Sequence, residues 1–131
     1  MSDLAQIERL MAQYFDGLYT CDVDALAQVF HPQAIYATAS GGAWLKLALN
    51  DYLQRVAQRP SPQSVGHTRT DEIEHIHLAG PHTALVRARC SIPGRSFVDL
   101  LTLVKVNQQW QIISKVFEFT EPEKPSDPSQ K

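Results

Sequence analysis

Hydrophobic residues near the start of the chain recur every three or four positions, which is the period of one face of an α-helix. The residues on this face are Leu4, Ile7, Met11, Tyr14 and Leu18. Asp3 and Gln6 have the spacing of a capping box, which predicts that the helix begins beside Asp3. The first 20 residues are therefore expected to form one amphipathic helix.

Two further helices and a hairpin are predicted before the middle of the chain. A short helix follows Asp22, whose side chain can cap it, and Pro32 helps to end it. Its apolar face consists of Leu26, Val29 and Phe30. Residues 34–47 alternate around a Gly-Gly turn, as a small hairpin does. A third helix is predicted over residues 50–59, capped by Asn50 and ended by Pro60.

From Val65 onward the hydrophobic period changes from that of a helix to the two-residue period of β-strands. Strands are predicted over residues 66–78, 82–92, 95–106 and 109–119. The segments between them hold turn-forming pairs, namely Gly80-Pro81, Pro93-Gly94 and Asn107-Gln108. Connections this short require antiparallel neighbours. The pattern therefore predicts an α+β fold in which three helices precede a four-stranded meander.

The third meander strand is apolar on both of its faces. Phe97, Leu101 and Leu103 alternate with Val98, Leu100 and Val104, and the last strand has the same character. A sheet with one face in water would instead alternate apolar and polar residues. Since three helices can cover only one face, we expect a second subunit to cover the other. The chain is thus predicted to be a homodimer through the outer face of its sheet.

The 131 residues are expected to form a single domain over residues 1–120, followed by a disordered, Pro-rich and charged tail over 121–131. The net charge is −2 and no long run of Lys or Arg occurs, so nucleic acid is not an expected partner. We find no signal peptide and no apolar segment long enough to cross a membrane, and Cys21 and Cys90 lie far apart. These features predict a cytoplasmic protein with reduced thiols and no membrane partner.

Three segments carry a resemblance to a known family: "YFDGLYTCDVDALAQVFHPQAIY", "GHTRTDEIEHIHLAGPHTALVRA" and "FVDLLTLVKVNQQWQIISKVFEF". Over residues 4–119 the chain resembles the nuclear-transport-factor-2-like superfamily of SnoaL-like cyclases, ketosteroid isomerase and scytalone dehydratase, and in particular its branch called putative lumazine-binding proteins. The resemblance implies a cone-shaped α+β fold, with three N-terminal helices packed on a strongly curved antiparallel sheet. It also implies an apolar pocket between helices and sheet that contains a few polar groups.

The resemblance also implies roles for two residues. His67 matches a histidine that often lines the superfamily's pocket. Asp99 falls at the place where scytalone dehydratase has an amide-bearing partner of that histidine, counted back from the shared spacing of Lys105 and Trp110. The catalytic tyrosine–aspartate pair of that enzyme is absent, because its positions hold Leu18 and Tyr19.

His75 and His77 have the H-x-H spacing that puts two residues on the same face of a strand. They could therefore bind one metal ion, but a third ligand is not evident. A regular strand would also mix polar and apolar residues on both faces, so we infer a β-bulge near residues 71–74. Beyond the bulge, Ile76 would point inward and both histidines outward. No metal is therefore expected.

Several polar and aromatic side chains are candidates for the pocket. Asp99 lies in an apolar strand, where a carboxylate is rarely buried without a partner, so it is either a pocket base or half of an ion pair with Arg69 or Lys115. A two-residue turn at Asn107-Gln108 would put Asp99 and Lys115 on opposite faces, and only a longer turn or a bulge would bring them together. The other lining candidates are Tyr14, Tyr36 and Trp44, for which ordinary packing is the alternative, together with Arg69, Leu101 and Lys115.

Three functions are compatible with these residues. The preferred one is binding of a small apolar or aromatic molecule without a cofactor. The second is a cofactor-free isomerase, dehydratase or cyclase, with His67 and Asp99 as acid and base and with Tyr14 or Arg69 stabilising an oxyanion. The third is a dimerisation module without turnover. Binding is preferred because the residues do not supply a complete acid, base and oxyanion set.

Overall fold

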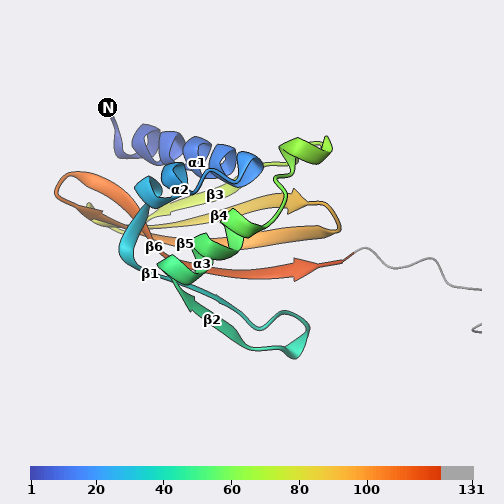
Figure 1. Cartoon of the computed structure of the whole chain (residues 1–131). Helices are drawn as coiled ribbons and strands as arrows, with labels where there is room; N and C mark the ends of the chain where they lie inside the picture. Colours follow the sequence, from blue (N-terminus) through green and yellow to red (C-terminus); the bar gives the residue numbers. More distant parts are fainter. Residues whose placement is uncertain (122–131) are drawn as a thin grey trace, which may run out of the picture.

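The computed structural model describes residues 1–121 and places three helices on one face of a curved six-stranded sheet (Figure 1). The helices are α1 (Asp3–Thr20), α2 (Val23–Val29) and α3 (Leu49–Gln58), and two short 3-10 turns are η1 (Ser40–Gly42) and η2 (Gln63–Val65). The strands are β1 (Phe30–Thr38), β2 (Leu45–Ala48), β3 (Glu72–Leu78), β4 (Thr83–Ile92), β5 (Arg95–Val106) and β6 (Gln109–Thr120). The predicted α+β class is therefore confirmed. The predicted disordered tail lies outside the described residues, apart from Glu121.

The meander is confirmed, and its last three strands agree with their predicted bounds to within one residue. The sheet order is β2-β1-β6-β5-β4-β3. All neighbours are antiparallel except β1 and β6, which pair in parallel. The predicted strand over 66–78 is wrong in its first half, since β3 begins only at Glu72. Residues before it contact α1 and the end of β4 through their side chains instead of pairing with a strand.

Two of the three predicted helix caps differ from those observed. The side chain of Asp22 caps α2 as predicted by accepting the N–H of Ala25. The α1 helix is capped by Ser2, whose hydroxyl accepts the N–H of Ala5, and not by the predicted capping box at Asp3. Asp3 instead binds Lys105 at 2.6 Å and so ties the helix to the sheet. The predicted cap at Asn50 is also wrong, because α3 begins one residue earlier without a side-chain cap.

The core lies between α1 and the inner face of the sheet. The apolar stripe of α1 packs on residues of β4, β5 and β6 such as Val86, Leu101 and Ile112, all of which are fully buried. The close approach of α1 and α2 depends on Gly17, because a Cβ atom there would lie 2.9 Å from the side chain of Leu26. This contact fixes α2 beside the last turns of α1.

Two β-bulges decide which side chains face the core. The register of β3 against β4 shifts between Ile73 and His75, which confirms the bulge inferred from the sequence. In β6 the register shifts at Ile113, so that Leu103 pairs with Ile112 but Leu101 pairs with Lys115. The turn at Asn107-Gln108 has two residues with positive φ, as a type I′ hairpin turn requires. The bulge, and not the turn, therefore brings Lys115 to the same face as Asp99.

The outer face of the sheet exposes several apolar side chains. Leu85, Leu100 and Val116 come from three adjacent strands, and each exposes between 38% and 45% of its surface. No helix of the described chain lies over them (Figure 1).

We predict that this outer face joins two copies of the chain. Sedimentation equilibrium at micromolar concentration should give twice the monomer mass of 14.7 kDa. Leu100→Lys should produce monomers, because a lysine at the centre of an apolar interface would be desolvated without a partner. Leu4→Lys, a change on α1 at a similarly exposed leucine, should leave the mass unchanged. A monomeric wild-type protein would contradict the prediction.

Candidate ligand-binding site

A cavity of about 60 Å³ lies where the ends of α1 and α3 meet the inner face of the sheet. At about 30 Å³ of liquid volume for each water molecule, it has room for about two. Its walls combine the aromatic rings of Tyr19, Tyr36 and Phe97 with three cationic side chains, and the remaining lining residues are mostly small or apolar. The cations are Arg59, Arg95 and Lys115. Such a mixture of apolar walls and few polar groups is typical of small-molecule sites.

Lys115 belongs to the lining of this cavity and is only 5% exposed. Its Nζ donates to the hydroxyl of Tyr52 at 3.2 Å. The same nitrogen lies 5.1 to 5.7 Å from the ring centres of Tyr14, Tyr36, Tyr52 and Phe117. Four aromatic rings therefore surround the ammonium group at distances at which ring faces attract cations.

The charge of Lys115 is retained despite its burial. Burial alone would lower the pKa of Lys115, but the acidic groups around it, Tyr52 and Asp99 foremost, outweigh burial and raise that pKa above its ordinary value. The side chain is therefore an ammonium ion at neutral pH. A buried ammonium ion can bind an anion or a polar ligand atom, but it cannot act as a nucleophile while it is protonated.

Asp99 is fully buried beside this aromatic group. Its Oδ2 accepts a hydrogen bond of 2.6 Å from the hydroxyl of Tyr14 and a longer one of 3.8 Å from the thiol of Cys90. Its Oδ1 has no hydrogen-bond partner among the described residues. Burial and then the charge of Asp99 raise the pKa of Tyr14 well above its ordinary value, and they raise the pKa of Cys90 to about 12. Both groups therefore stay protonated and can donate to the carboxylate.

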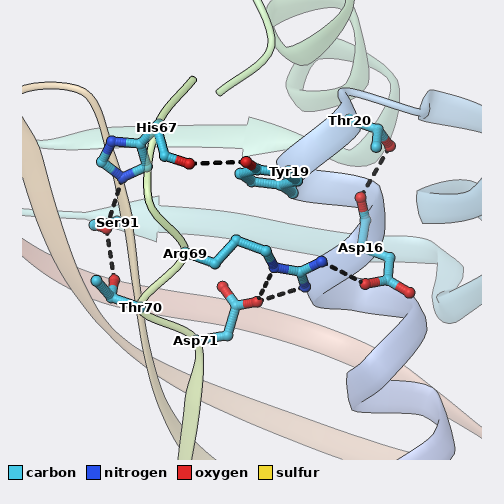
Figure 2. Close-up of polar contacts among 8 residues, drawn as sticks. All are labelled: Asp16, Tyr19, Thr20, His67, Arg69, Thr70, Asp71 and Ser91. Carbon is cyan, nitrogen blue, oxygen red and sulfur yellow. Dashed lines mark hydrogen bonds and ion pairs between the residues drawn. The ribbon is translucent and has the colours of Figure 1, made fainter. Parts of the chain in front are cut away.

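The segment before β3 forms the rim of the cavity and is attached to α1 and β4 by polar contacts (Figure 2). Nε2 of His67 lies 2.9 Å from the hydroxyl of Ser91, and the backbone carbonyl of His67 accepts the hydroxyl of Tyr19 at 2.8 Å. Arg69 bridges Asp16 of α1 at 2.9 Å and Asp71 at 2.6 Å, above the ring of Tyr19. These contacts keep His67 and Arg69 at the surface.

No hydrogen bond or ion pair joins His67, Arg69 or Asp99 to one another within residues 1–121, so an acid–base pair of His67 and Asp99 stays a prediction. His67 and Arg69 precede β3 and bind Ser91 and Asp16, whereas the carboxylate of Asp99 points at Tyr14. The predicted alternative, an ion pair of Asp99 with Arg69 or Lys115, is not formed either.

The other predicted lining residues are distributed over three environments. Tyr36 and Lys115 lie in the cavity wall. Tyr14 and Leu101 are fully buried in the adjoining core and do not line the cavity. Trp44 lies between η1 and β2, is 72% exposed and does not line the cavity. The β1–β2 hairpin extends away from the helices (Figure 1).

Sequence reasoning missed Arg59, Arg95, Cys90 and Phe97 as lining residues. Phe97 belongs to the inward set with Leu101 and could have been found from that alternation. Arg59 was assigned only as the end of a helix before Pro60, and no pattern marks its side chain as inward. Its position depends on how the chain leaves α3, which is a tertiary property.

A larger groove of about 570 Å³ lies at the opposite end of α1, but it is a weaker candidate. It is broad and open, and glutamines from α1, α2 and the β5–β6 turn contribute much of its lining. One of them, Gln13, already donates to Gln28 and to the carbonyl of Ala25. The groove contains no buried charge, so we assign the site to the smaller cavity around Lys115.

His75 and His77 are exposed on β3, opposite Arg87 and Leu85 of the outer face. Their ring centres lie 6.3 Å apart. Within residues 1–121, no cluster of three or more His, Cys, Asp or Glu side chains is arranged to hold a metal ion. In the same part of the chain, no helix is both long enough and apolar enough to cross a membrane.

We predict that Tyr14→Phe lowers the free energy of unfolding by about 1–3 kcal/mol, because it removes the hydroxyl donor of a buried carboxylate. Urea denaturation followed by circular dichroism would measure the loss. Tyr19→Phe is the matched control, since its hydroxyl bonds a partly exposed carbonyl at the rim and its removal should cost less. Equal losses for the two variants would contradict the assigned role of the Tyr14–Asp99 contact.

The double variant His75→Ala with His77→Ala should leave the urea midpoint unchanged, since both side chains are exposed. Elemental analysis of protein purified without an affinity tag should find no stoichiometric zinc. Zinc present in the wild type and lost in the double variant would overturn this prediction.

Comparison with known proteins identifies the fold and the family. A crystal structure of a protein of unknown function from Silicibacter pomeroyi, described as NTF-2 like, matches with a TM-score of 0.79 at 20% identity, covering 89% of this chain and 95% of the other. An NTF2-like protein of unknown function from Shewanella baltica matches with a TM-score of 0.80 at 20% identity over 92% and 95% of the two chains. A ketosteroid isomerase-like protein from Erwinia carotovora atroseptica matches with a TM-score of 0.70 at 15% identity over 92% and 98%.

These likenesses extend over nearly the whole of each chain, and at such low identity they establish the fold alone. Among curated proteins, none matches the chain significantly. The sequence model of the family described as "Putative lumazine-binding" matches residues 2–118, which is most of the chain. The protein therefore belongs to this family, and its fold is that of the NTF2-like structures.

Proposed function

We propose that this protein binds a small organic molecule in the cavity bounded by Tyr36, Phe97 and Lys115. The observation that carries the proposal is that Lys115, a buried lysine, belongs to the lining of that cavity. Its only hydrogen-bond acceptor among the described residues is one tyrosine hydroxyl, although an ammonium group has three donors. The site therefore has donor capacity that a ligand can use.

Aromatic residues give the cavity a preference for planar molecules. Tyr36 stacks on Tyr52 with ring centres 4.6 Å apart, and Phe117 lies against both Tyr36 and Phe97. These contacts hold the rings in fixed orientations, so a planar ligand can pack on them without first ordering them. The description of the family names a small-molecule ligand, which agrees with a site of this kind.

The alternative is a cofactor-independent lyase or isomerase, and the likeness to a ketosteroid isomerase-like protein favours it. The acid and base required by that alternative, His67 and Asp99, do not meet at one cavity, and Asp99 has no exposure to a substrate. Binding without turnover is for this reason the function that the geometry supports better. A role in dimerisation is compatible with it, because the apolar outer face lies on the other side of the sheet from the cavity.

Two-dimensional NMR of the ¹⁵N-labelled protein with a library of small planar compounds would test the proposal. We expect compounds that bind to shift the amide signals of Tyr36, Arg59, Phe97 and Lys115. Native mass spectrometry of the untagged protein should reveal whether such a molecule co-purifies. The proposal fails if the shifts cluster instead at Gln13, Gln28 and Trp110 in the open groove, or if no compound produces shifts.

A further inference from the structure

The charges around the cavity are predominantly positive. Arg59, Arg95 and Lys115 line it, together with a single carboxylate, Asp71. Asp71 is bound to Arg69, and Arg95 is bound to Glu121 at 3.2 Å. The cations that remain without a carboxylate partner among the described residues are Arg59 and Lys115.

Arg59 enters the wall because of the way the chain leaves α3. Its backbone is extended and its N–H still bonds the carbonyl of Val56, so the helix ends at this residue. Pro60 follows, and the buried Pro62 then lies in the cavity wall. This local geometry turns the side chain of Arg59 toward the cavity instead of along the helix.

The Nε–H of Arg59 is shielded from solvent and has no hydrogen-bond partner within residues 1–121. A buried donor on a charged group costs free energy when it lacks an acceptor, so such groups rarely remain unpaired. An arginine presents its Nε–H and a neighbouring Nη–H side by side, in the geometry of a carboxylate. The unpaired group is therefore matched in charge and shape by a planar anion.

Tyr36 lines the cavity together with Arg59 and Lys115, the two cations that are unpaired within the described residues. Burial raises the pKa of Tyr36, while Lys115, Arg59 and Arg55 act in the opposite direction by their positive charges. Nζ of Lys115 lies 5.7 Å from the centre of the Tyr36 ring. A small anion next to Tyr36 lies within the field of both cations.

We infer that the ligand of this cavity is a small aromatic acid whose carboxylate binds Arg59 and Lys115. The inference deepens the proposed function and rests on it. The ring of such an acid packs on Tyr36 and Phe97. With a volume of about 60 Å³, the cavity takes the compact acidic group, and the ring lies against the aromatic part of the wall.

Isothermal titration calorimetry at pH 7 with benzoate and benzamide tests whether the ligand must be an anion. The two compounds share their ring, but only benzoate is charged. Wild-type protein should bind benzoate about tenfold or more tightly than benzamide, as is typical of a charge-assisted hydrogen bond. Benzylamine, a cation of similar size, should not bind.

Two variants on α3 and at its end form a matched pair. Arg59→Gln should weaken benzoate binding by about tenfold or more and benzamide binding by less, because the bond of Arg59 to a carboxylate is stronger than its bond to a neutral amide. Arg55→Gln removes an exposed cation one turn earlier, outside the cavity lining, and should weaken benzoate binding much less, because only its longer-range charge is lost. Lys115→Met should also abolish the preference for benzoate, but since it alters the core, Arg59→Gln is the decisive variant.

Benzamide binding as tightly as benzoate would overturn the assignment of an acid while leaving the cavity a ligand site. Equal losses in Arg59→Gln and Arg55→Gln would also overturn it, because the effect would then be one of overall charge. Binding of neither compound would overturn the assignment of a small aromatic acid, and the NMR library would separately decide whether the cavity binds any small molecule.

Discussion

One extra residue in β6 determines the chemistry of the cavity. The register shift at Ile113 turns the following side chains over, so that Lys115 lies opposite Leu101 on the inner face of the sheet. In an unbulged strand, Lys115 would lie on the outer face among Leu85 and Leu100, and the interior would contain the carboxylate of Asp99 without any buried cation. Bulges are found where a sheet must redirect a side chain, and this one directs an ammonium group into the core.

The interior then has to accommodate two opposite charges that do not form a direct ion pair. Tyr14 donates to Asp99, Tyr52 accepts from Lys115, and the rings of both tyrosines face the ammonium group. Phenols can do this because each combines a hydrogen-bonding hydroxyl with a ring that attracts cations. Burying such groups contributes little stability compared with an apolar core, and buried charges are often retained for function. The arrangement is for this reason better understood as a binding site than as a stabilising device.

The rim of the cavity is held by ion pairs and hydrogen bonds, whereas its floor is held by the packing of side chains. The contacts of Arg69 with Asp16 and Asp71 lie largely in solvent, and exposed ion pairs each contribute about 0–1 kcal/mol. The floor, in contrast, combines the buried side chains of Leu18, Cys90 and Lys115 with the partly buried rings of Tyr36 and Phe97. A ligand larger than the present cavity would therefore displace the rim at low free-energy cost while the aromatic floor keeps its shape.

The sequence alone determined the order of the elements, because each depends on local patterns. Helical periodicity located α1, period-two alternation located β4, β5 and β6, and Asn107-Gln108 marked their last turn. The mixed polarity of residues 66–78 was sufficient to infer the bulge in β3, since a regular strand would have put Ile76 and His67 on opposite faces. The resemblance to a known family supplied the cone-shaped arrangement, which no local pattern encodes.

Tertiary structure alone decided which polar residues meet. The bulge at Ile113 could not be predicted from the sequence, because an isoleucine fits either face of an apolar strand. The sequence therefore did not determine which face of the sheet Lys115 occupies. The side chain of Arg59 lines the cavity because of the path of the chain from α3 to Pro62. His67 is held at the rim, because Ser91 contacts its ring and Tyr19 donates to its carbonyl. Contacts between residues far apart in sequence depend on register and on chain path, and these are fixed by packing of the whole domain.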